Sequence, residues 1–285
     1  MSYYIKYPSE NANVTEIWSA LRLPFEPKGW LYDMREELKR AIKEISLDDS
    51  RILSAVYISQ NQGFCDIENI LIYNVGPGVF KDICRNGLLL ERGYQRVVSP
   101  SGNQESYSHY QSYSLVGKRQ DPLYWKEKRV LASWKGIFLE KMPTKPHDYW
   151  RLMKENQVFV ADAAHNGKYG IEIVIQLPVN SSNNFAGLIK PMLDGIIAAF
   201  HSYSGNDLVE VSRRLASVLP VQAEGISAML IDKKIDVLGS RSVVRPYRNF
   251  VQWNPADDKC MVIKLVNNFI SENRIIMDGR IFVIE

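Results

Sequence analysis

Residues 169–203 carry two neighbouring apolar runs that predict a strand followed by a helix. The first run, YGIEIVIQL at 169–177, is rich in β-branched residues, as strands are. The polar loop NSSNN follows, and an apolar helix is expected over 185–203. Because both runs are apolar, we expect a central strand with the helix packed on its sheet. This packing would bury Ile173, Ile175, Leu193 and Ile197.

The rest of the chain mixes strands and helices without a strict alternation of the two. Residues 31–45 predict an amphipathic helix, because apolar residues recur there at helical spacing. The other expected elements are strands at 51–59, 67–75, 250–266 and 274–284, strands within 105–141, and helices at 79–86, 146–156 and within 205–240. This order predicts an α+β fold with a mixed sheet or sheets and packed helices.

The length of 285 residues allows one large domain or two small ones. If there are two, the boundary is expected just before the strand at 169–177. An N-terminal α/β part would then span 1–160 and a C-terminal α/β part 161–285. A single domain is the alternative.

Composition excludes several classes of protein. Apolar residues make up 46% and charged residues 24%, which is ordinary for a globular protein, and the net charge of +3 is only mildly basic. The three cysteines, Cys65, Cys84 and Cys260, form no C-x-x-C pair, so a disulfide framework or cysteine-rich zinc site is not expected. The first residues have no apolar signal segment, and no run is long enough to span a membrane. We expect a cytoplasmic protein without membrane partners.

Charged residues occur at two places in the C-terminal half. Lys190 and Asp194 lie one turn apart on the expected helix, so both project from one face. Asp257 and Asp258 stand together just before a strand, where two carboxylates can hold a hard cation. The alternative interpretations are a surface ion pair for the first place and a turn after Asn254-Pro255 for the second.

Together these two places resemble the RusA-type Holliday-junction endonucleases. That family has a strand, then a D-x-D-N-x-x-K-x-x-x-D pattern opening a helix, and later an aspartate pair before a strand. The family's lysine matches Lys190 and its helix aspartate matches Asp194, while the later pair matches Asp257 and Asp258. The first two aspartates and the asparagine fall on Asn184, Ala186 and Gly187 instead. The resemblance implies a C-terminal nuclease-like fold, DNA as partner and Mg²⁺ as cofactor.

The residues expected to act on a phosphodiester follow from that resemblance and from the strand before the helix. Asp194, Asp257 and Asp258 would hold Mg²⁺, which activates water and offsets developing charge. Lys190 would stabilise the transition state. Glu172 lies on the strand, facing opposite to its neighbours Ile171 and Ile173, and is a further catalytic candidate. Asp162 and His165, just before that strand, are other possible ligands. The alternative for Glu172 is a solvent-exposed sheet face.

A basic and aromatic segment lies beside the aspartate pair. Arg241, Arg245 and Arg248 fall within eight residues without an intervening acid, with Tyr247 among them and Trp253 soon after. Guanidinium groups bind phosphates and aromatic rings stack on bases, so this segment predicts nucleic-acid binding. The alternative is a solvated face over buried aromatics.

These observations lead to one leading hypothesis for the function and one alternative. The first is a protein that binds DNA or RNA, either a diverged Mg²⁺-dependent nuclease or its inactive relative. The alternative is a non-catalytic interaction subunit of a larger bacterial assembly, such as a defence assembly, with a protein partner or a second copy of itself. Residues 70–94 have the outline of the start of an ADP-ribosyltransferase fold, but the polar NAD-binding motif is replaced by Tyr73-Asn74-Val75-Gly76.

Overall fold

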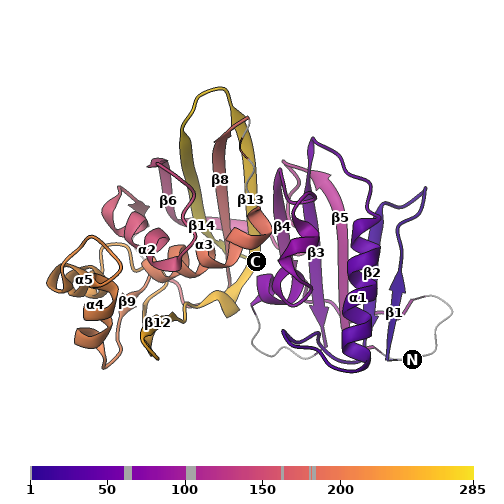
Figure 1. Cartoon of the computed structure of the whole chain (residues 1–285), viewed down its shortest axis with the longest axis horizontal. Coiled ribbons are helices and arrows are strands. Elements are labelled where there is room, and N and C mark those ends of the chain that lie inside the picture. Colours follow the sequence, from indigo (N-terminus) through magenta and orange to yellow (C-terminus); the bar gives the residue numbers. More distant parts are fainter. Residues whose placement is uncertain (1, 61–65, 101–106, 162–163, 180, 182–183) are drawn as a thin grey trace.

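A computed structural model describes residues 2–60, 66–100, 107–161, 164–179, 181 and 184–285 (Figure 1). Cys65 and Asp162 lie outside these described residues. Ten strands form one mixed sheet in the order β1-β2-β5-β3-β4-β13-β8-β14-β6-β7. Their bounds are β1 Tyr3–Lys6, β2 Val14–Ser19, β3 Arg51–Ser59, β4 Gly87–Arg92, β5 His109–Gly117, β6 Glu127–Leu139, β7 Phe159–Val160, β8 Tyr169–Pro178, β13 Cys260–Ile270 and β14 Ile275–Ile284.

Helices and short strands complete the described chain. The helices are α1 Trp30–Lys43, η1 Asn69–Tyr73, η2 Pro77–Phe80, α2 Pro146–Glu155, α3 Phe185–Ala199, α4 Leu208–Ala216, α5 Ala223–Ile231 and η3 Asp257–Lys259. The remaining strands are β9 Ser202–Tyr203, β10 Ser240–Arg241, β11 Val244–Tyr247 and β12 Phe250–Trp253. Strands and helices without strict alternation make this an α+β fold, as expected. Among the helices that the structure describes, none combines the length and the apolar character of a membrane span.

The predicted central strand and its helix are confirmed. Strand β8 lies between β13, its parallel neighbour, and β14, its antiparallel neighbour. Residues Ile171, Ile173 and Ile175 alternate onto one face of β8, and α3 covers them there. The four side chains expected to be buried, Ile173, Ile175, Leu193 and Ile197, are each at most 1% exposed.

Helices α1, α2 and α3 lie over one face of the sheet (Figure 1). Residues from these helices join strand residues such as Leu53, Leu90 and Ile263 in one continuous core. Helix α2 crosses α3 closely at Gly195, where an added Cβ would stand 2.2 Å from the Pro146 carbonyl oxygen. The opposite face has a smaller apolar cluster that includes Leu89, Val262 and Phe282.

Three local expectations were wrong. The helix expected at 79–86 is only the short 3-10 helix η2 at Pro77–Phe80, and turns follow it. Residues 67–75, expected as a strand, instead form one turn of π-helix at η1. Their buried residues Ile67, Ile70, Leu71 and Val75 recur at three- and four-residue spacing, which suits a helix on a sheet. The stretch 250–266 is also not one strand, because the turn at η3 separates β12 from β13.

The sheet does not divide at the expected boundary between residues 160 and 161. Strand β6 precedes that point, yet it pairs with β14 from Glu127 to Leu139. Helix α2 likewise precedes it and packs against α3. The segment from β6 to α2 therefore packs with the C-terminal elements, through pairing that is distant in sequence.

Candidate metal centre

A cleft of about 1220 Å³ opens beside α3. Its walls come from the loop and helix at 66–74, from α3 through Lys190 and Asp194, and from the segment 251–259. Arg22, Pro24 and Phe25 line its other side. The cleft thus collects residues from segments that are far apart in the sequence.

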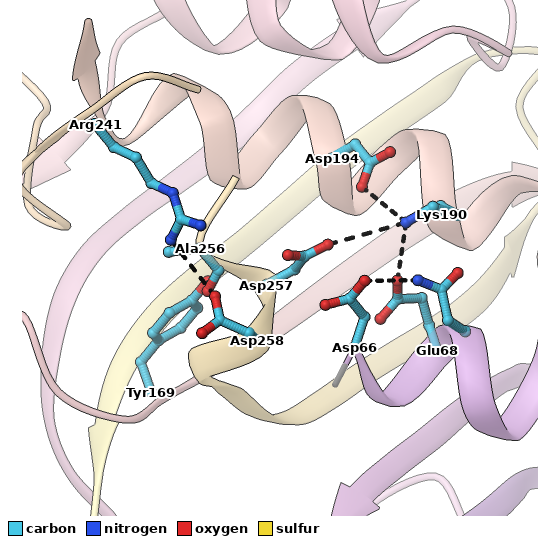
Figure 2. Close-up of polar contacts among 10 residues, drawn as sticks. Asp66, Glu68, Tyr169, Lys190, Asp194, Arg241, Ala256, Asp257 and Asp258 are labelled. Atoms are coloured by element: carbon cyan, nitrogen blue, oxygen red, sulfur yellow. Dashed lines mark hydrogen bonds and ion pairs between the residues drawn. The ribbon is translucent and has the colours of Figure 1, made fainter. Parts of the chain in front are cut away.

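Lys190 lies at the centre of the charged group in this cleft (Figure 2). Its Nζ donates hydrogen bonds to Glu68 Oε1 at 3.2 Å and to Asp194 Oδ1 at 3.3 Å. Asp257 Oδ2 lies 3.9 Å from the same nitrogen. Lys190 and Asp194, one turn apart on α3, therefore do not form an isolated surface ion pair. Lys190 also contacts two further acids, Glu68 and Asp257.

Three carboxylates in this group are placed to share a cation. Oxygen atoms of Asp66, Glu68 and Asp257 all lie within 4.8 Å of one another. The Glu68 side chain is 1% exposed, and its Oε2 has no hydrogen-bond partner in the described part of the chain. A buried carboxylate oxygen without a partner is costly, and a bound cation would satisfy it. Hard divalent cations take such oxygen ligands, so this donor set fits Mg²⁺, Mn²⁺ or Ca²⁺.

The cluster carries more acidic than basic side chains. Four acids, Asp66, Glu68, Asp194 and Asp257, surround the one amine of Lys190. Burial raises the pKa of Glu68 to about 7, although the nearby Lys190 opposes the rise. Burial and the charges of Asp66 and Glu68 raise the pKa of Asp257. Without a cation, the site must hold protons to limit repulsion between its carboxylates.

The charges of the acids also act on Lys190. Burial alone would lower its pKa, but Glu68, Asp194 and Asp257 outweigh burial and raise that pKa. Lys190 therefore stays positively charged at any physiological pH.

Neighbouring hydrogen bonds hold the site residues in place. Asn69 Nδ2 donates to Asp66 Oδ2 at 2.6 Å, where η1 begins. The buried Tyr169 hydroxyl donates to the Ala256 carbonyl at 3.0 Å and fixes the segment before the Asp257 turn. The Tyr73 hydroxyl donates to the Gly187 carbonyl at 2.9 Å and joins η1 to the start of α3. The loop, the helix and the turn are thus tied together by bonds beside the acids.

The structure brings together some of the expected site residues. Lys190, Asp194 and Asp257 converge as described. Asp258 lines the same cleft but turns toward Arg241, whose Nη1 lies 3.5 Å from its Oδ1 (Figure 2). Of the two adjacent aspartates, therefore, only Asp257 lies within the cluster of three carboxylates.

Glu172 lies away from Lys190, contrary to the expectation that the two would act together. The alternation along β8 turns Glu172 to the sheet face opposite α3, as its position relative to Ile171 and Ile173 predicts. There Arg280 Nε donates to Glu172 Oε2 at 2.8 Å, and Lys264 Nζ lies 3.6 Å from Oε1. The sheet itself separates Glu172 from the cleft. His165 is half-buried and its ring bonds the Lys168 carbonyl, also outside the cluster.

The basic and aromatic residues spread over the β11–β12 hairpin and its approach. Arg241 and Trp253 line the cleft. Trp253 also packs against the buried Trp150, with ring centroids 5.9 Å apart. Arg245 is exposed and bonds Gln252 on the paired strand. Arg248 stacks over the ring of the half-exposed Tyr247. Of these residues, Arg245, Tyr247 and Arg248 are exposed and do not line the cleft.

Sequence reasoning missed Asp66 and Glu68. Glu68 lies in the run 67–75 that was interpreted as a strand, and Asp66 stands just before it. Extended backbone would have placed both on the same face as Ile70 and Ile72. The available signal was Asp66-Ile67-Glu68-Asn69, two acids and an amide followed by buried residues at helical spacing.

Comparisons with known proteins provide no relative from which a role could be taken. No protein-family model, curated protein or solved structure matches the chain.

Proposed function

We propose that this protein binds a divalent cation through Asp66, Glu68 and Asp257 and uses it to hydrolyse phosphodiester bonds of nucleic acid. The observation that carries the proposal is the unpartnered, buried Glu68 Oε2 beside two further carboxylates and a lysine in an open cleft. The RusA-type resemblance supports it, because Asp66, Glu68 and Asn69 supply the acid-x-acid-Asn order that Asn184, Ala186 and Gly187 lack.

The chain's own residues supply the other requirements of this reaction. A bound cation would activate water and neutralise charge on the phosphate. A water oxygen bonds to phosphorus, the bond to the leaving oxygen breaks, and one proton passes from the water while the leaving oxygen gains one. Lys190 places a permanent positive charge beside the developing negative charge. Arg241, which lines the cleft, and the exposed Arg245 and Arg248 would contact the backbone of a bound strand.

Cation binding and cleavage test the proposal together. Millimolar Mg²⁺ or Mn²⁺ should raise the melting temperature, because a ligand that binds only the folded state stabilises it. The same ions should support cleavage of labelled single-stranded, duplex or branched DNA, or RNA. Glu68→Gln and Asp257→Asn should weaken cation binding by more than about tenfold and abolish cleavage.

Glu172→Gln provides the matched control, since it removes a carboxylate from the other face of the same sheet. It should leave cation binding and cleavage intact. A melting temperature that does not respond to either ion, with no cleavage of any substrate, would contradict the nuclease proposal.

A non-catalytic interaction subunit is the second candidate. One observation favours it: Tyr247 and Phe250, paired across the β11–β12 hairpin, are 48% and 70% exposed. Exposed aromatic side chains at such a hairpin suit a protein partner. Binding that is insensitive to salt and lost in Phe250→Ala would favour this candidate over nucleic acid.

A further inference from the structure

The sheet has the same arrangement on both sides of the pairing between β4 and β13. Outward from that joint, β4, β3, β5 and β2 lie on one side, and β13, β8, β14 and β6 on the other. On each side the first two strands are parallel and the next two pairings are antiparallel. Strands β4 and β13 themselves are antiparallel, which is the relation that a two-fold axis between them requires.

The chain visits the two sides in the same order. Apart from the edge strands β1 and β7, the first half runs β2, α1, β3, the short helices η1 and η2, β4 and β5. In the second half it runs β6, α2, β8, α3, β13 and β14. The main difference is the segment between α3 and β13, which carries α4, α5 and the β11–β12 hairpin. Each half is thus one β-α-β-α-β-β unit.

The registers of the strands agree with this equivalence. Arg51 and Tyr169, the first residues of β3 and β8, lie 118 positions apart (169 minus 51). The same offset carries Leu53 onto Ile171. Their parallel partners, Leu88 and Ile263, lie 175 positions apart (263 minus 88), because the second half holds the longer segment between α3 and β13. Exchanging the halves then carries the central pair Leu88–Leu265 onto Ile263–Leu90, and both of these pairs occur.

The offset of 118 positions gives four residues of the candidate metal centre, Asp66, Glu68, Lys190 and Asp194, a counterpart in the other half. Asp66 and Glu68 correspond to Asn184 and Ala186, while Lys190 and Asp194 correspond to Ile72 and Gly76. The Glu68–Lys190 ion pair therefore has Ala186 and Ile72 as its counterpart, and both of those side chains are 0% exposed. The position in the candidate metal centre is therefore charged, whereas the equivalent position in the other half is apolar.

We infer that the chain is a fused pair of equivalent units, that its single cation centre takes Asp66 and Glu68 from one unit and Asp257 and Lys190 from the other, and that the equivalent position in the other half has become apolar. The inference rests on the proposed function in one respect only: a chain with one centre cleaves one strand per encounter. A symmetric pair would hold two centres related by the axis, and would suit paired cuts.

The number of cations per chain tests the single centre. Titration of the protein with Mn²⁺, followed by calorimetry, should give one site per chain, and Glu68→Gln should remove it. Two equivalent sites, or one site that survives Glu68→Gln, would overturn the inference.

A matched pair of variants tests the equivalence of the two positions without any cation. Lys190→Ile alone leaves Glu68 buried among other carboxylates, so it should lower the melting temperature by several degrees. Adding Glu68→Ala recreates at this position the apolar pair present at its counterpart, and should restore most of the melting temperature. A double variant that is no more stable than Lys190→Ile would show that the two positions are not equivalent.

The products from a supercoiled plasmid test the functional consequence. With Mn²⁺, nicked circles should accumulate before linear DNA forms. Linear DNA that appears at once would contradict a single centre. If no cleavage occurs, the nuclease proposal fails, while the cation count and the variant pair still decide the inference.

Discussion

Glu68 combines near-complete burial with an oxygen atom that has no partner in the described residues. Burial raises its pKa to about 7, whereas a glutamate in an unfolded chain titrates near 4.5. Between these values the folded state binds a proton that the unfolded state has released. The contribution of Glu68 to stability therefore falls as pH rises through this window.

We expect the melting temperature of the cation-free protein, measured in EDTA, to fall between pH 5 and pH 8. The loss from Glu68 is of the order of 3 kcal/mol, since one pKa unit corresponds to about 1.4 kcal/mol. Glu68→Gln should flatten much of this decline, and Glu172→Gln should not. A melting temperature that rises over this range in EDTA, and is unaffected by Glu68→Gln, would contradict the burial of a titrating Glu68.

The β11–β12 hairpin carries two exposed arginines, Arg245 and Arg248, and Arg241 precedes it. Arg241 already pairs with Asp258, so reversing its charge would disturb the cleft as well as any bound strand. Arg245 bonds only the neutral Gln252 among the polar contacts described, and Arg248 stacks on Tyr247. These two arginines are the cleaner test of the hairpin.

Arg245→Glu with Arg248→Glu should reduce affinity for single-stranded DNA or RNA more than about tenfold at low salt. It should also reduce the dependence of the binding constant on salt, because fewer phosphate contacts release fewer counterions. Arg274→Glu, before β14 and paired with Glu272, is a control that should change neither. Unchanged affinity and salt slope in the hairpin variant would remove nucleic acid as its partner.

The whole molecule depends on the joint between β4 and β13. Gly87 begins β4 with φ of 128°, and an added Cβ would stand 2.0 Å from the Leu265 carbonyl oxygen. The conformation and the space both require glycine there. Because the main core cluster runs through both halves, damage at this joint affects the entire chain.

Gly87→Ala should therefore destabilise the protein by more than about 2 kcal/mol, through backbone strain and a clash in the sheet centre. The free energy of unfolding is measured by denaturant titration, with tryptophan fluorescence and circular dichroism as the two probes. Gly78→Ala, where an added Cβ meets nothing within 4 Å, should cost far less. Equal stability of the two variants would mean that the backbone of β4 and β13 can shift to accept a Cβ at position 87, contrary to this prediction.

The local sequence pattern was enough to predict those strands and helices whose own residues determine their conformation. The β-branched run of β8 and the apolar run of α3 predict a strand and a covering helix, and both lie as expected. The one-turn spacing of Lys190 and Asp194 also predicts their contact, because helix geometry alone sets it. The alternation along β8 likewise predicts that Glu172 faces away from Ile171 and Ile173.

Tertiary structure alone decided which of these residues share a site. Glu68 lies 122 positions before Lys190, and no local period links the two; the packing of η1 beside α3 brings them within 3.2 Å. The side of the sheet on which α3 packs separates Glu172 from Lys190, and the pairing of β6 with β14 joins segments on both sides of the expected boundary. Sequence periodicity reports which face of an element is buried, whereas contacts between distant segments depend on how the sheet orders its strands.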